Sequence, residues 1–184
     1  MKTARSPDTF PSRDGSTSRS ANALIAVWAW LWPVVSTGIL VIIAVAPATG
    51  PQTAFSLAGL LPLLAVHYWT ITGRTTYALV LAFTAGLVVD GVSGGPLGYW
   101  ALVYVAAVEV AAVMAGLALD SIAAHGVALV ASLAAAATVQ WAVVFAYVHT
   151  APDPWGLATA TVLAAAVYPL VGIVLDAGMG RGRS

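Results

Sequence analysis

Long apolar stretches alternate with short polar breaks along most of this 184-residue chain. A helix that crosses a membrane needs about 20 predominantly apolar residues to span about 30 Å of hydrocarbon. Six stretches are candidates, and we predict a helix in each of them: 23–46, 53–71, 76–89, 96–119, 122–148 and 155–177. The third stretch is short and is expected to extend into the glycine-rich loop that follows it. The pattern therefore predicts an all-α membrane protein built as a bundle of six transmembrane helices.

Composition supports a membrane protein and limits its chemistry. The chain is 60% hydrophobic and only 8% charged, whereas soluble domains average about 45–50% apolar and about 25% charged residues. It has no cysteine, which excludes disulfides, thiolate catalysis and cysteine-based metal sites. Residues 1–20 are polar, and we expect a disordered cytoplasmic tail there. The six-helix transmembrane domain then covers 21–178, and a second cytoplasmic tail covers 179–184.

The basic residues indicate an orientation. If the N-terminus is cytoplasmic, six spans return the C-terminus to the same side, and every Lys and Arg then lies on it, as the positive-inside rule requires. These residues are Lys2, Arg5, Arg13, Arg19, Arg74, Arg181 and Arg183. A cleaved secretory signal is the competing reading, because Ala44–Ala46 mimics a cleavage site. The apolar run before it is longer than the apolar core of a signal peptide, which has about 7–15 residues. We therefore treat the run as a span.

A glycine-rich loop separates the third and fourth predicted spans. It reads Asp90-Gly91-Val92-Ser93-Gly94-Gly95-Pro96-Leu97-Gly98. We expect a rigid, tight turn, because glycine permits positive φ and close backbone approach. The Asp90 carboxylate is expected to accept N–H groups of this turn or to cap the fourth helix, and Pro96 is expected at the first position of that helix. Anion binding by the backbone N–H groups is an alternative.

Two polar residues lie inside predicted spans. Glu109 falls near the middle of the fourth span, where a charge costs about 2.5–3.5 kcal/mol on insertion scales. It should therefore face the bundle interior or a partner. Its possible roles are a contact with another subunit, a ligand contact, a proton relay, or a bond to a neighbouring Ser, Thr or carbonyl. Gln140, on the fifth span, is a candidate for a hydrogen bond between helices.

We expect no catalytic residue, no metal site and no cofactor. Three scattered histidines do not make a metal site. Residues 91–94 do read G-x-S-G, which is the nucleophile motif of rhomboid intramembrane proteases, and His149 follows at the end of the fifth span. The His–Asn signature of those enzymes is missing, however, because His67 is followed by Ile71 at the matching position. A rhomboid-like serine protease is therefore only a remote alternative.

The loop and its flanks resemble the rod shape-determining protein MreD family. In that family a proline-led apolar span ends in an aromatic pair, a G-L-x-x-D motif follows, and then a G-G-P-L-G motif. The matching segments here are Leu61–Trp69, Gly86–Asp90 and Gly94–Gly98. The resemblance covers the second to fourth spans; Glu109 and the long polar N-terminal tail are not part of the family pattern.

The resemblance implies a six-helix protein of the bacterial inner membrane, with both termini in the cytoplasm. Such proteins are scaffolds of the cell-elongation complex and are not enzymes. Their partners are the bitopic protein MreC and, indirectly, the MreB filament and the RodA–penicillin-binding-protein pair that builds peptidoglycan. Their fold is similar to the substrate-binding S-component of energy-coupling-factor vitamin transporters. A vitamin-binding subunit of a transporter is accordingly the alternative function.

Overall fold

The computed structural model describes residues 15–45, 57–117, 121–149 and 153–179, and these residues form helices and the short connections between them. The helices are α1 (Gly15–Val45), α2 (Leu57–Ile71), α3 (Ala78–Ser93), α4 (Tyr99–Ala115), α5 (Ile122–Val148) and α6 (Pro154–Gly178). The predicted all-helical class is therefore confirmed for the described part of the chain. Helices suit lipid because they satisfy their backbone hydrogen bonds internally.

Three of these helices are long and apolar enough to cross a membrane. They are the Ala23–Val45 part of α1, α5 and α6. Helices α2, α3 and α4 are apolar but contain 15, 16 and 17 residues, respectively. These lengths lie at or below the lower end of the usual range of about 17–25 residues for a spanning helix. That α2, α3 and α4 also cross the membrane, which would give six spans, thus remains a prediction.

Several predicted boundaries differ from those in the structure. Helix α1 begins at Gly15, so residues 15–20, which we expected in the disordered tail, are helical; residues 1–14 lie outside the described part. Helix α3 continues to Ser93, one turn beyond Val89, which agrees with its predicted extension into the glycine-rich loop. The fourth helix begins at Tyr99 and not at Pro96. The bounds predicted for α5 agree with the structure.

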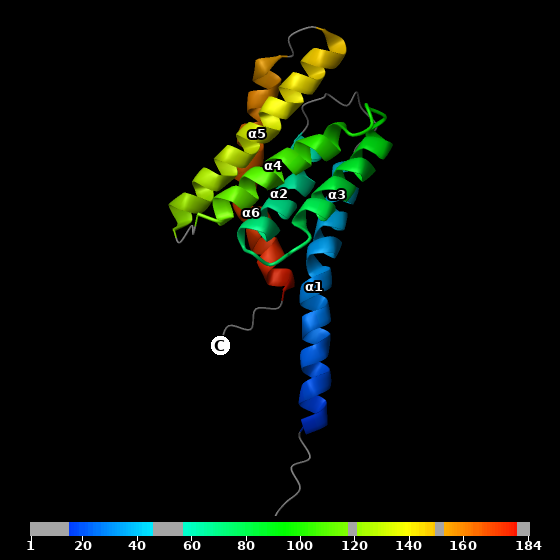
Figure 1. The fold of residues 1–184 in the computed structure, drawn as a ribbon, viewed down its shortest axis with the longest axis vertical. Helices are drawn as coiled ribbons and strands as arrows, with labels where there is room; N and C mark the ends of the chain where they lie inside the picture. Colours follow the sequence, from blue (N-terminus) through cyan, green and yellow to red (C-terminus); the bar gives the residue numbers. More distant parts are fainter. Residues whose placement is uncertain (1–14, 46–56, 118–120, 150–152, 180–184) are drawn as a thin grey trace, which may run out of the picture.

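Helix α2 is the centre of the bundle. It packs against α1, α3, α4 and α6, and every residue from 62 to 70 is buried. A helix that is apolar on all faces is expected in a protein core or in a membrane, and α2 lies in the core of this bundle. Figure 1 shows α1 running alongside the other helices and extending well beyond them at its N-terminal end. On that extension, residues 23–31 are all exposed.

Hydrogen bonds fasten α1 and α6 to each other at the end of the bundle where α1 enters. The Trp32 indole Nε1 donates to the carbonyl of Leu175 at 3.0 Å, and Trp28 Nε1 donates to the carbonyl of Gly178 at 3.2 Å. At the same end, Arg74 forms an ion pair with Asp176 at 3.0 Å. This pair links the α2–α3 connection to the end of α6. The Arg74 guanidinium therefore has its partner within the chain.

Candidate functional site

The Asp90 carboxylate joins α3 to the beginning of α4. Its side chain is 1% exposed. Oδ2 accepts the backbone N–H groups of Gly98 (2.9 Å) and Ala101 (3.3 Å), and Oδ1 accepts the N–H of Trp100 at 2.8 Å. The first N–H groups of a helix have no partner within the helix and carry a partial positive charge. One carboxylate therefore satisfies three of these donors and caps α4 from the neighbouring helix.

Two glycines give the chain the path that this cap requires. Gly94 ends α3 with φ of 67°, and Gly98 precedes the first turn of α4 with φ of 91°. Both values lie in the left-handed region, which costs other residues about 1–2 kcal/mol. Gly95 has no positive φ. Pro96 lies outside the helix, where its carbonyl accepts the N–H of Tyr99 at 3.2 Å. The prediction that Pro96 begins α4 is wrong, because the helix begins where Asp90 can reach its N–H groups.

Close packing also holds together the junction of α3 and α4 around Asp90, which we call the corner. A Cβ added to Gly86 of α3 would lie 2.3 Å from Cα of Ala101, so the backbones of α3 and α4 are in contact there. A Cβ added to Gly59 of α2 would lie 2.3 Å from the Trp100 ring. The Tyr104 hydroxyl also donates to the carbonyl of Gly59. The residues around Asp90 thus bind α2, α3 and α4 into one rigid unit.

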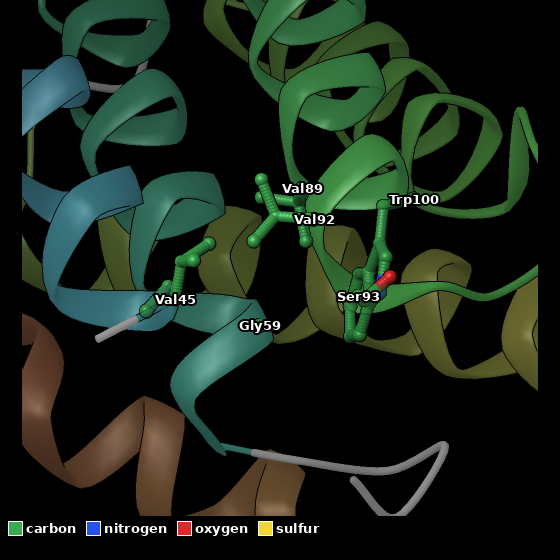
Figure 2. A pocket seen from close by; sticks show the side chains of 7 residues that line it. Val45, Gly59, Val89, Val92, Ser93 and Trp100 are labelled. Atoms are coloured by element: carbon green, nitrogen blue, oxygen red, sulfur yellow. The ribbon is translucent and has the colours of Figure 1, made fainter. Parts of the chain in front are cut away.

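A small cavity lies beside this corner, and its lining comes from α1, α2, α3 and α4 (Figure 2). Its volume is about 10 Å³, whereas a single water needs about 10–15 Å³. Val45 and Gly59 contribute to the lining, as do Ser93 and Trp100. The cavity is too small for a vitamin or for a peptide substrate.

Ser93 has a hydrogen-bond partner in its own helix. Its hydroxyl donates to the carbonyl of Asp90 at 3.3 Å. His149 ends α5 as an exposed cap residue with φ of 58°, and within the described ranges no hydrogen bond joins Ser93 to a histidine. A serine nucleophile needs a base within hydrogen-bond reach. The structure therefore does not bring together the pair on which the protease alternative depends.

Glu109 lies on the outer surface of the bundle. It is exposed, whereas Ala107, Val108 and Ala111 of the same helix are buried. Among the residues that the structure describes, none makes a hydrogen bond or an ion pair with Glu109. Of the two surroundings expected for Glu109, the bundle interior is therefore wrong for this chain by itself. The contact with a partner stays a prediction.

Gln140 lies inside the bundle and not on its surface. Its side chain is buried, and its amide Nε2 has no hydrogen-bond partner among the described residues; the same is true of both ring nitrogens of His67 and the hydroxyl of Ser132. The structure buries His67 in α2, with its ring against Tyr168 at a centroid distance of 5.4 Å. Nothing in the apolar sequence around His67 indicated this.

Within the described segments, no group of three or more His, Asp or Glu residues could hold a metal ion. Compared with protein-family models, with curated proteins and with solved structures, the chain matches none of them. The likeness to the MreD family therefore depends on the motif residues quoted above.

Proposed function

We propose that this chain is a non-enzymatic scaffold of the bacterial inner membrane that resembles MreD and helps the cell-elongation complex to control cell shape. One observation carries the proposal. The residues that carry the resemblance, from Asp90 to Gly98, join α3 to α4, and the buried Asp90 carboxylate fixes this joint by accepting three backbone N–H groups. The cavity that the described residues form beside Ser93 has a volume of about 10 Å³, which is too small for a substrate. A motif that fixes two helices relative to each other supports the proposed scaffold role, because a scaffold presents fixed surfaces to its partners.

The proposed topology has six spans, with both termini in the cytoplasm. The end of the bundle with Trp28, Trp32 and Arg74 would then face the cytoplasm, in keeping with the positive-inside rule and with interfacial tryptophans. The short helix α2 does not argue against this topology, because protein surrounds it and it need not match the lipid by itself. Helices α3 and α4 are slightly short for a span, and local thinning of the bilayer accommodates such a mismatch.

The proposed partners are those of a cell-elongation scaffold. An MreC-like bitopic protein would contact the bundle directly. MreB and the RodA–penicillin-binding-protein pair would be linked through it. In the described segments, the connections between helices are only a few residues long, so the helices themselves offer the surface for such contacts.

Deletion of the gene from its native bacterium tests this function. We expect rod-shaped cells to become round or wide, and the wild-type chain and Ser93→Ala to restore their shape. Asp90→Asn is expected to restore it poorly, since the corner is part of the scaffold's fold. Cells that keep their shape after deletion would contradict the proposed role, and rescue by wild type but not by Ser93→Ala would favour the protease.

A vitamin-binding transporter subunit is the second candidate. The observation in its favour is a set of buried polar atoms that have no hydrogen-bond partner among the described residues, on Thr37, His67, Ser132 and Gln140, because buried polar groups normally have a partner. If these groups bind a vitamin, one compound of a vitamin panel should raise the melting temperature of the purified protein. Gln140→Leu should abolish that shift. A panel without any shift would count against this candidate.

A further inference from the structure

Glu109 belongs neither to the corner around Asp90 nor to the buried core, so neither of them explains a carboxylate at this position. It lies ten residues after Tyr99 and six before Ala115, the two ends of α4. At 1.5 Å of rise per residue, these separations are about 15 Å and about 9 Å. The carboxylate therefore lies well inside the apolar length of the helix, and in the proposed six-span topology it is far from both the headgroups and bulk water. Ionisable residues at such positions almost always face a polar partner.

From this position we infer that the face of α4 around Glu109 docks a transmembrane helix of a different protein, which carries a Lys, Arg or His side chain at the depth of Glu109. The inference rests on the scaffold role proposed above, and it names the site and the chemistry of one direct partner. Charge complementarity is the basis, because the exposed carboxylate has no partner among the described residues and the lipid chains offer none.

A second copy of this chain is a poor occupant of that face. The sequence has no Lys or Arg in residues 20–73 or 75–180, so a copy has no cation of this kind at mid-depth. Arg74 lies at the end of α2 and is paired with Asp176. The histidines do not help, because His67 is buried in the core and His125 and His149 lie at the two ends of α5. The cation has to come from another protein.

The shape of the face suits a closely packed helix. Ala112 and Gly116 lie three and seven residues after Glu109, on the same side of α4, and both are exposed. A Cβ added to Gly116 would meet only carbonyl oxygens of its own helix. Small residues allow the backbones of two membrane helices to approach each other. The face therefore combines exposed small residues with one carboxylate.

Photo-crosslinking of the full chain in its native membranes tests the inference. A benzophenone amino acid replaces Val113, which is 63% exposed and lies one turn after Glu109; a control replaces Ile173, which is 65% exposed on α6. We expect a protein adduct from position 113 at a yield at least ten times that from position 173. Glu109→Ala should lower the yield at position 113 at least tenfold, while the purified variant melts like wild type.

Mass spectrometry of the adduct then identifies the partner segment. We expect an apolar segment of another protein with a Lys, Arg or His near its middle, and replacing that residue by Ala should lower the yield as Glu109→Ala does. Glu109→Lys together with an acidic residue at the partner position should restore the adduct. An adduct with a second copy, adducts with lipid alone, or a yield that does not depend on Glu109 would overturn the inference.

The outcomes for the docking face and for the proposed function are separate. If deletion of the gene leaves cell shape unchanged while the Glu109-dependent adduct forms, the cell-elongation role fails and the docking face stands. If deletion changes cell shape but no Glu109-dependent adduct forms, the docking face fails and the scaffold role stands.

Discussion

Asp90 and Glu109 are two carboxylates on neighbouring helices, and the structure treats them in opposite ways. Asp90 is buried and accepts three backbone N–H groups at the beginning of α4. Glu109, on α4 itself, is exposed and is bonded to none of the described residues. Both are surrounded in sequence by apolar residues, so hydropathy alone does not distinguish them. The difference is that only Asp90 lies near backbone donors that a helix leaves without partners.

This contrast separates a carboxylate that holds the fold together from one that is available to another molecule. Substitutions at the corner should therefore lower the stability of the isolated protein, whereas those at Glu109 should affect assembly. The substitutions below test this division, starting with the largest expected effect. Stability is the free energy of unfolding of the purified chain in mixed micelles titrated with SDS.

The largest effect is expected from Asp90→Asn. The amide keeps the shape of the side chain but loses the charge, and its NH₂ group turns a donor toward backbone donors. Removing one partner of a buried, charge-assisted network costs about 3–5 kcal/mol, so we expect a loss of about 3 kcal/mol or more. The control is Asp153→Asn, since Asp153 caps α6 in an exposed position with two N–H bonds. Its loss should be about 0.5 kcal/mol or less, because Asn caps a helix about as well as Asp does, and equal losses at both positions would contradict the special role of Asp90.

Gly86→Ala should have the next largest effect. The new Cβ would overlap the backbone of α4 at Ala101 and push α4 away from the carboxylate that caps it. Overpacking of this kind costs about 1–3 kcal/mol, and we expect a loss near the upper value. Gly91→Ala is the matched control on the same helix, because nothing lies within 4 Å of a Cβ added there. A helical Gly→Ala change gains up to about 1 kcal/mol, so the two variants should differ in sign.

Gly98→Ala should cost less. Its backbone φ of 91° is unfavourable for alanine by about 1–2 kcal/mol, while its N–H can still reach Asp90. Gly95→Ala is the control in the same loop, because Gly95 has no positive φ and an added Cβ would make only an ordinary contact with Ser93. If Gly95→Ala destabilises the chain as much as Gly98→Ala does, the described path of the turn is wrong.

The smallest effect is expected from Ser93→Ala. The hydroxyl makes one bond, to a carbonyl of its own helix, and does not belong to the Asp90 cap. The loss should be about 0.5 kcal/mol or less, at the low end for a single hydrogen bond. The second readout is labelling by a serine-reactive probe, which wild type should not show. Labelling of wild type that disappears in Ser93→Ala would reopen the protease alternative.

The apolar pattern predicted six helices and the bounds of α5, because helix formation in those segments depends only on local composition. It failed at Pro96, since the beginning of α4 depends on Asp90, which is ten residues away from Trp100 in sequence and in contact with it in space. It also could not orient Glu109 or His67. Their helices are apolar on every side, so no amphipathic period indicates which face is buried.

The free energy of unfolding of Glu109→Gln, measured beside Asp90→Asn in the same micelles, tests the central contrast most directly. We expect Glu109→Gln to stay within about 0.5 kcal/mol of wild type, as for a surface substitution, and Asp90→Asn to lose about 3 kcal/mol or more. A loss at Glu109 as large as that at Asp90 would show that Glu109 supports the fold of the chain itself, and it would contradict the assignment of that face to a partner.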